Sequence, residues 1–157
     1  MNKPLISVKD LSVDYITENA PIKAVRNVSF KIFRGEIFGL VGESGSGKST
    51  VIQAMMRILP PPALISEGRV FIDGKNIMEA SEQDIIGFRW KQISIVMQSA
   101  LNALNPVLSV REQIFDVLNT HKGLIGKEAD DRARELLSLV DIDFTHLESY
   151  PHQLSGG

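Results

Sequence analysis

Short stretches of alternating or continuous apolar residues occupy much of the first hundred positions. Alternation with polar residues is typical of a half-buried strand, and a short continuous apolar run is typical of a buried one. We expect strands at residues 5–17, 22–33, 36–41, 68–73 and 93–97. The first two flank turn residues at 18–21, so they are predicted to pair as an antiparallel hairpin.

Apolar residues recur at helical spacing in other parts of the chain. Helices are predicted at about residues 51–59, 81–90, 109–119 and 127–140. Prolines at 60–62 should end the first helix, because proline lacks an N–H and clashes with the preceding turn. Ser81 with Asp84, and Ser109 with Glu112, have the spacing of helix starts, the second pair as a capping box.

The last of these helices is predicted to be amphipathic. Its apolar face would comprise Ala129, Ala133, Leu136, Leu137 and Val140. Acidic residues Glu128, Asp130 and Asp131 are expected in its first turn, where negative charge complements the helix dipole.

The order of the elements predicts an α/β fold. Strands and helices alternate through residues 1–99, whereas residues 100–157 are helical in character. We therefore expect a first domain at 1–99, with an antiparallel β part and an α/β core, and a helical second domain at 100–157.

Composition narrows the class of protein. The chain has 157 residues, 43% of them hydrophobic, and a formal net charge of −2, which gives no basic footprint for nucleic acid. Cysteine is absent, which excludes disulfides and cysteine-ligated metal sites. We find no signal-peptide core at residues 1–10 and no run of roughly 18 apolar residues, so a membrane role would come through a partner.

The strongest chemical motif lies between the predicted strand 36–41 and the helix that follows it. Nine consecutive residues contain the phosphate-loop pattern G-x-x-x-x-G-K-[ST]: Gly42, Glu43, Ser44, Gly45, Ser46, Gly47, Lys48, Ser49 and Thr50. The order of strand, glycine loop and helix is the one this motif requires. A flexible glycine-serine turn is the simpler alternative.

These residue types suit a nucleoside triphosphate. Glycines allow successive backbone N–H groups to approach the phosphates closely, and the following helix adds the positive end of its dipole. Lys48 would bind the β- and γ-phosphates, and the Ser49 hydroxyl would be a ligand of Mg²⁺.

The ordered set of Tyr15, the phosphate loop, Gln98 and a final Leu-Ser-Gly-Gly resembles the ATP-binding subunits of ABC transporters. Within that family, residues 104–114 (Leu-Asn-Pro-Val-Leu-Ser-Val-Arg-Glu-Gln-Ile) are similar to the subunits of oligopeptide, dipeptide and nickel importers. The resemblance implies a P-loop NTPase core with an N-terminal antiparallel β subdomain and an inserted helical subdomain, incomplete at the C-terminus. One departure is Ser99-Ala100, where relatives usually have Asp-Pro.

The resemblance also implies roles for individual residues. Tyr15 would stack on the adenine of ATP, and Gln98 would contact Mg²⁺ or the attacking water, with Lys48 as the second catalytic residue. The signature residues would contact ATP held by the opposite subunit: Leu154, Ser155, Gly156 and Gly157. Each role has a simpler alternative. Tyr15 could be a packing residue of its strand, Gln98 a solvated residue at a strand end, and residues 154–157 a plain terminal turn.

Other polar residues receive structural predictions. The family's switch histidine follows the signature, so His121, His146 and His152 are expected at the surface. Arg89 and Trp90 are likewise expected to be structural.

The family's magnesium-ordering Asp and water-polarising Glu also follow the signature. We therefore expect the 157-residue chain to bind ATP and Mg²⁺ but not to hydrolyse ATP alone. The resemblance further implies that strands 36–41 and 93–97 pair with strands encoded after residue 157, so that they lack neighbours here.

The implied function is that of a peripheral ATPase at the cytoplasmic face of the membrane, powering an importer for peptides or similar solutes. Its partners would be a second ATP-binding subunit, transmembrane permease subunits and, indirectly, a substrate-binding protein, with no nucleic acid. A soluble ABC-type ATPase acting on ribosomes or DNA, and a non-catalytic nucleotide-binding fragment, are the alternatives.

Overall fold

The computed structural model describes residues 3–89, 91–97 and 103–154. The chain divides into two compact units, Met1–Arg89 and Trp90–Gly157, and each is described by itself. The domain boundary predicted between residues 99 and 100 lies outside the described residues and stays a prediction.

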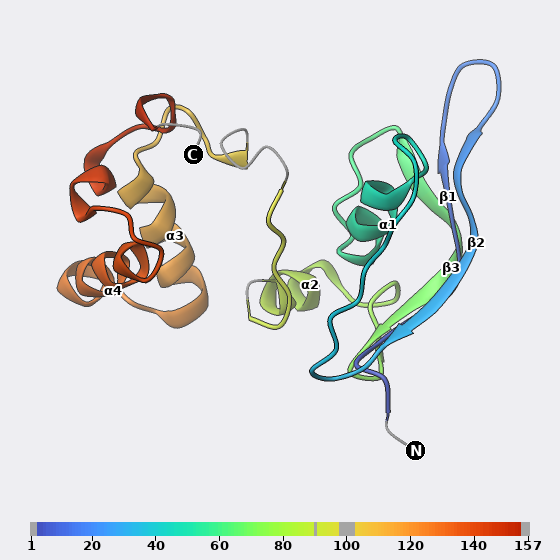
Figure 1. Ribbon diagram of the computed structural model, residues 1–157, viewed down its shortest axis with the longest axis horizontal. Helices are drawn as coiled ribbons and strands as arrows, with labels where there is room; N and C mark the ends of the chain where they lie inside the picture. Colours follow the sequence, from blue (N-terminus) through green and yellow to red (C-terminus); the bar gives the residue numbers. More distant parts are fainter. Residues whose placement is uncertain (1–2, 90, 98–102, 155–157) are drawn as a thin grey trace. The chain divides into compact units, whose positions relative to one another are not determined.

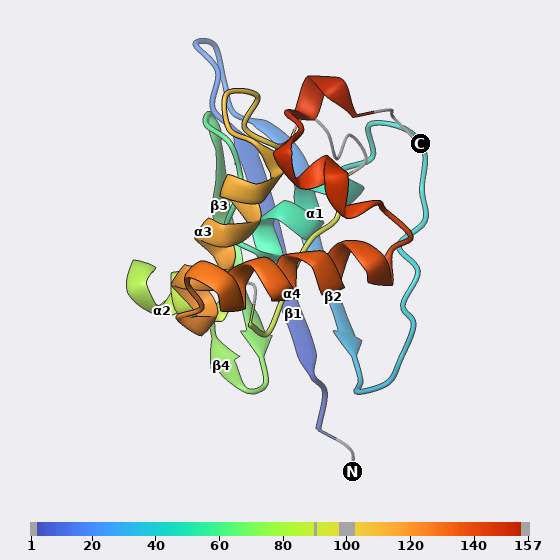
Figure 2. The same ribbon diagram turned by 90° about the vertical axis from the view of Figure 1, so that its left-hand side faces the viewer.

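A four-stranded antiparallel sheet forms the base of the first unit (Figure 1). Its strands, in the order β2-β1-β3-β4, are β1 (Ile6–Tyr15), β2 (Ile22–Ile32), β3 (Ala63–Ile72) and β4 (Lys75–Asn76). β1 pairs along its length with β2 and β3, and β4 is a short arrow beside β3 (Figure 2). The predicted N-terminal hairpin and antiparallel β part are therefore confirmed.

Helix α1 (Lys48–Met55) packs against β1 and β2. Alternating apolar residues of the strands and one side of α1 form the core of the unit. The buried members in the strands and α1 are Val8, Leu11, Val13, Val25, Val70, Ile72, Val51, Ala54 and Met55. Each fully buried side chain of valine or leucine size contributes about 1.5–3 kcal/mol through the hydrophobic effect.

The sheet is bent by a bulge where β1 passes Gly68 of β3. The pairing register shifts between Lys9 and Ser12, and Asp10 has a positive φ of 51°. Gly68 has φ 98°, and a Cβ there would lie 2.6 Å from both the Asp10 carbonyl oxygen and the Leu11 Cα. A glycine is required because the β1 backbone occupies the space of a side chain.

Helix α2 (Glu82–Phe88) completes the first unit, with Ser81 as its N-cap as predicted. The predicted helix at 51–59, in contrast, is wrong at its C-terminal end. α1 ends at Met55, before the prolines, because Arg57 adopts the left-handed conformation with φ 53°. A left-handed residue after the last turn ends an α-helix.

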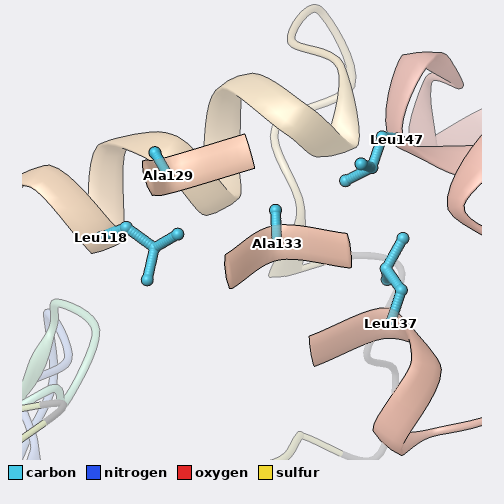
Figure 3. Packing of buried hydrophobic residues seen from close by; sticks show 5 residues of the cluster. All are labelled: Leu118, Ala129, Ala133, Leu137 and Leu147. Carbon is cyan, nitrogen blue, oxygen red and sulfur yellow. The ribbon is translucent and has the colours of Figure 1, made fainter. Parts of the chain in front are cut away.

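Two helices and two short 3₁₀ segments build the second unit: α3 (Val110–Lys122), α4 (Gly126–Leu139), η2 (Phe144–Glu148) and η3 (Pro151–Gln153). Both helices were predicted, and the expected capping box opens α3. Their core, drawn in Figure 3, comprises Leu118, Ala129, Ala133, Leu137 and Leu147.

The predicted apolar face of α4 is correct except at its end. Val140 is 62% exposed because the helix ends at Leu139. Of the acidic residues placed in the first turn, Glu128 alone lies there. Asp130 instead binds Arg111 of α3 at 3.0 Å and Arg134 at 2.7 Å, and the hydrogen bond from Arg134 lowers the pKa of Asp130.

Two predicted buried strands are wrong in this structure. Residues 36–41 and 93–97 form no regular strand, and Ile37, Val41 and Val96 are at least 90% exposed. A strand needs a neighbour for its N–H and C=O groups, and no described residue pairs with 36–41. The ring of Phe38 does stack on Phe30 of β2, with centroids 5.1 Å apart.

Within the described ranges, no helix combines the length and the apolar character needed to cross a membrane.

Replacing Gly68 with alanine should lower the free energy of unfolding by about 2–4 kcal/mol, because positive φ and a backbone clash act together. Urea denaturation of the variant would measure this. Gly87→Ala is the matched control: it lies inside α2 with open space around it, so its effect should be neutral or stabilising by about 0.5–1 kcal/mol. Equal effects of the two substitutions would contradict the bulge as described.

The capping box of α3 should make stability depend on pH. The backbone N–H of Ser109 donates to Glu112 Oε2 at 2.7 Å, and this bond, with a second from the Ser109 hydroxyl, lowers the pKa of Glu112 from 4.5. The stabilisation is present above pH 4.5 and is lost as the pH falls below it through the folded-state pKa.

Glu112→Gln keeps an acceptor for Ser109 but removes the titrating proton, so melting temperatures of the variant should fall less on acidification. Glu18→Gln, at the exposed hairpin turn, is the control and should keep the full pH dependence. A pH dependence of Glu112→Gln identical to that of the unsubstituted chain would argue against the capping interaction.

Candidate functional site

The phosphate loop runs from Gly42 into the first turn of α1. Gly45 has φ 78° and Gly47 has φ 88°, with Ser46 between them. Positive φ at alternate residues is typical of an anion-binding nest, in which backbone N–H groups point toward one side of the loop. Gly47 is the N-cap of α1 and offers no side chain to the free N–H groups of the first turn, which leaves them for an external anion.

Lys48 closes over this loop. Its Nζ donates to the carbonyl oxygens of Gly42 at 2.8 Å and Glu43 at 2.6 Å, and to Ser46 Oγ at 3.3 Å. The Ser46 N–H also donates to the Glu43 carbonyl at 3.2 Å. These bonds hold the ammonium at the loop and fix the loop's turn.

Gly47 is where the loop touches the sheet. A Cβ on Gly47 would lie 2.6 Å from the Ala24 carbonyl oxygen and 3.3 Å from Val25 Cγ2, both on β2. This position admits only glycine without a shift of backbone. This close contact determines how near the start of α1 lies to β2.

The first residues of α1 differ in exposure. Ser49 is exposed at the helix start, as a metal ligand would have to be, whereas Thr50 is buried against the core. The described ranges contain no group of three His, Asp or Glu side chains that could bind a metal ion. The Ser49 hydroxyl could serve as one ligand of a metal ion at this loop, and phosphate oxygens and water could supply others.

Tyr15 is half-buried at the end of β1. It pairs with Ile22 of β2 and Ala63 of β3. Val25, which contacts the loop at Gly47, pairs with Val13, so Tyr15 lies two positions along β1 from that contact. The phosphate loop and Tyr15 thus share one end of the sheet.

The remaining predicted site residues lie in the second unit, and most lie outside the described residues. Gln98, Ser155, Gly156 and Gly157 belong to that group. Leu154 is described, as the C-cap of η3, where its N–H donates to the Pro151 carbonyl at 3.2 Å.

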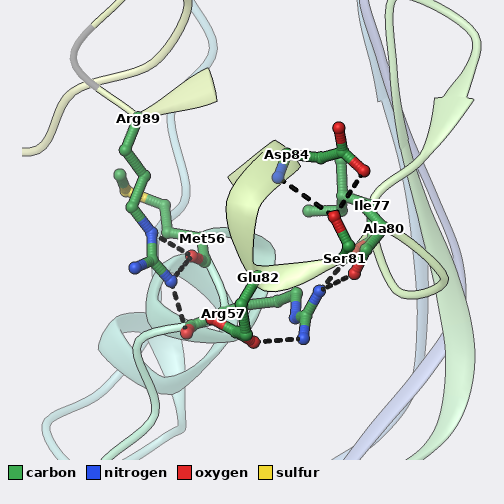
Figure 4. Close-up of polar contacts among 8 residues, drawn as sticks. All are labelled: Met56, Arg57, Ile77, Ala80, Ser81, Glu82, Asp84 and Arg89. Carbon is green, nitrogen blue, oxygen red and sulfur yellow. Dashed lines mark hydrogen bonds and ion pairs between the residues drawn. The ribbon is translucent and has the colours of Figure 1, made fainter. Parts of the chain in front are cut away.

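Sequence reasoning gave Arg57 no role and treated Arg89 as structural. Arg57 follows the last turn of α1 and its guanidinium reaches Ala80 and Glu82, whereas Arg89 brings its guanidinium back to the C-terminal end of α1 (Figure 4). Arg89 donates to the carbonyl of Arg57 at 2.8 Å although the two residues are 32 positions apart. No local pattern could have shown this contact.

Residues 25–157 match the ABC transporter family. The oligopeptide transport ATP-binding protein OppD of Bacillus subtilis is 38% identical over 156 residues, and the dipeptide transport ATP-binding protein DppD of the same organism is 40% identical over 156 residues. Each alignment covers 98% of this chain but 44% and 47% of the relatives. The chain therefore spans less than half the length of these curated relatives.

Solved structures give the same result. The dimeric ABC transporter cassette MJ0796 superposes with a TM-score of 0.82 and 28% identity over 96% of this chain and 63% of that one. Its post-hydrolysis state, bound to ADP and Pi, gives a TM-score of 0.81. The predicted resemblance to ABC-type subunits of peptide importers and the predicted fold class are confirmed, and the chain belongs to the ABC transporter family.

Proposed function

We propose that the chain is the nucleotide-binding part of an ATP-binding subunit that powers an importer for peptides or similar solutes. The observation that carries the proposal is the glycine loop at the start of α1, with Lys48 held across it and Gly47 set against β2. The names of OppD and DppD, which describe peptide transport, support the cargo class.

The phosphate loop fits ATP with Mg²⁺. The amides of Gly45, Gly47 and Lys48 would bind phosphate oxygens, and the Lys48 ammonium would neutralise the β- and γ-phosphates. Ser49 would supply a hydroxyl to Mg²⁺, whose role is to neutralise phosphate charge. The ADP-bound state of MJ0796 supports a nucleotide at this loop.

Tyr15 is proposed to stack on the adenine ring. Its place at the end of β1, near the contact between the loop and β2, supports this role. An aromatic face binds any base without hydrogen-bond specificity, so the phosphates would provide most of the affinity.

Gln98 is proposed to contact Mg²⁺ or the attacking water, and Ser155, Gly156 and Gly157 to contact ATP held by a second subunit. The dimeric state of MJ0796 supports a two-subunit arrangement. Permease subunits would hold the pair at the cytoplasmic face of the membrane, with a substrate-binding protein delivering the cargo.

Turnover is proposed to belong to the assembled subunits. The reaction would be in-line attack of water on the γ-phosphoryl group, helped by positioning and charge stabilisation. The 157-residue chain alone is proposed to bind ATP without hydrolysing it.

Lys48→Ala should weaken the binding of Mg-ATP to the chain about tenfold or more, which corresponds to roughly 1.4 kcal/mol, because the ammonium is lost from the phosphates. Calorimetric titration would measure the dissociation constants. Lys31→Ala is the control, because Lys31 is an exposed lysine on β2. A phosphate-release assay on the same samples should stay at background. Unchanged affinity in Lys48→Ala, or release above background that Lys48→Ala abolishes, would refute the proposal.

Tyr15→Ala should weaken ATP binding about fivefold or more, since base stacking on an aromatic residue provides about 1–3 kcal/mol. Tyr15→Phe keeps the ring and should bind ATP as the unsubstituted chain does. The same calorimetric titration distinguishes the two. If both variants bind equally well, Tyr15 is a packing residue of the strand.

A further inference from the structure

The C-terminal end of α1 has an unusual residue at its turn. The Arg57 N–H donates to the Ala54 carbonyl at 3.0 Å and the Ile58 N–H to the Gln53 carbonyl at 3.0 Å, which is the Schellman pattern. The residue after the cap is left-handed in this motif and is usually glycine. Here it is Arg57, with φ 53°, so the backbone is strained where glycine would be relaxed.

The side chain of Arg57 has contacts that glycine could not make. Its Nη1 donates to the carbonyl oxygens of Ile77 at 3.2 Å and Ala80 at 2.6 Å. Its Nη2 binds Glu82 Oε1 at 2.7 Å, and the side chain is 23% exposed. Arg57 therefore connects the end of α1 to the segment that leads into α2 and to the first turn of α2 itself.

Arg89 makes the reverse connection from the end of α2. Its Nη2 donates to the carbonyls of Met56 at 3.1 Å and Arg57 at 2.8 Å, and its Nε donates to Met56 at 3.3 Å. Figure 4 shows the Arg89 guanidinium at the carbonyls of Met56 and Arg57, and the Arg57 guanidinium on the other side of this turn, beside Ala80 and Glu82. Carbonyls at a helix C-terminus carry partial negative charge, so the Arg89 guanidinium is favourably placed there, while the Arg57 guanidinium pairs with Glu82.

The opposite end of the same helix is the phosphate loop. α1 has eight residues, about 12 Å at 1.5 Å per residue, so a tilt at its last turn moves its first turn. Its N-terminus is set against β2 at Gly47, and its C-terminus is held by the two arginines. Together these contacts determine where the amides of Gly45 to Lys48 point.

We propose that Arg57 and Arg89 are positioning residues for the β- and γ-phosphates of the nucleotide, acting through the orientation of α1. The inference rests on the proposed function, because it assumes that ATP binds at this loop. Neither guanidinium is assigned a contact with the nucleotide.

The test compares Mg-ATP with AMP, which lacks the β- and γ-phosphates. Nuclear magnetic resonance titration of the 157-residue chain gives both dissociation constants even when binding is weak. If the arginines position the loop for the β- and γ-phosphates, substituting them lowers the dissociation constant for AMP divided by that for Mg-ATP. If a substitution only reduces the folded fraction, both dissociation constants rise equally and the ratio is unchanged.

Arg57→Gly is the most informative variant. Glycine is relaxed at the left-handed position, so the helix end keeps its backbone while the side-chain bonds disappear. Arg89→Ala removes the second set of bonds, and Arg89→Lys retains a charge that can reach one carbonyl. Arg34→Ala is the charge-matched control, because Arg34 pairs with Asp73 in a pair that is largely exposed.

We expect the affinity ratio to fall about fivefold in Arg57→Gly and Arg89→Ala, the scale of losing one helix-end interaction. Arg89→Lys should be intermediate, and Arg34→Ala should match the unsubstituted chain. A ratio unchanged in Arg57→Gly overturns the inference, as does an unchanged ratio in both Arg89 variants.

Arg57→Gly and Arg89→Lys keep the test decisive should Arg89→Ala not fold. Failure of the inference is also distinguishable from failure of the proposed function. Absence of ATP binding by the unsubstituted chain would overturn both, whereas binding that depends on Lys48 but not on Arg57 or Arg89 would overturn only the positioning role.

Discussion

The approach of Gly47 to the β2 backbone is the contact on which the phosphate loop depends. A Cβ at that position would lie 2.6 Å from the Ala24 carbonyl oxygen, so the loop can sit this close only because the residue is glycine. The contact places the N-terminus of α1 at the edge of a sheet whose core is buried and rigid. Donors held by such packing need little reorganisation when they meet an anion.

The antiparallel sheet serves the loop in two ways. β2 provides the surface against which Gly47 rests, and β1 carries Tyr15 to the same end of the sheet. The bulge at Asp10 and Gly68 bends the strands away from a flat arrangement. Phosphate and base sites can therefore come from segments nearly thirty residues apart in the chain, because the sheet brings their ends together.

Local chemistry explains which parts of the fold could be predicted. The hairpin of β1 and β2 follows from alternation between neighbouring segments, and the start of α3 follows from Ser109 and Glu112 alone. The segments 36–41 and 93–97 were predicted as strands from their apolar content. A strand also requires a partner for its backbone, and partners are not encoded in the segment itself.

The candidate site divides in the same way. The glycines and Lys48 belong to one short motif at residues 42–50, and their spacing alone predicts phosphate binding. Helix α1 was predicted to extend to residue 59 because the prolines at 60–62 are evident in the sequence. The left-handed conformation of Arg57, after which the helix cannot continue, is not. Its bonds to Ala80 and Glu82, and those of Arg89 to Met56, join residues 23 to 33 positions apart, so they arise from tertiary structure alone.

The central claim is that backbone amides of the loop bind the phosphates of ATP, and hydrogen exchange tests it most directly. Exchange at the amides of Gly45, Gly47 and Lys48 would be compared with and without Mg-ATP, with the amides of β3 as the internal reference. The account predicts slower exchange at the three loop amides and no change in β3. Unchanged exchange at the loop under conditions where ATP is bound would contradict it.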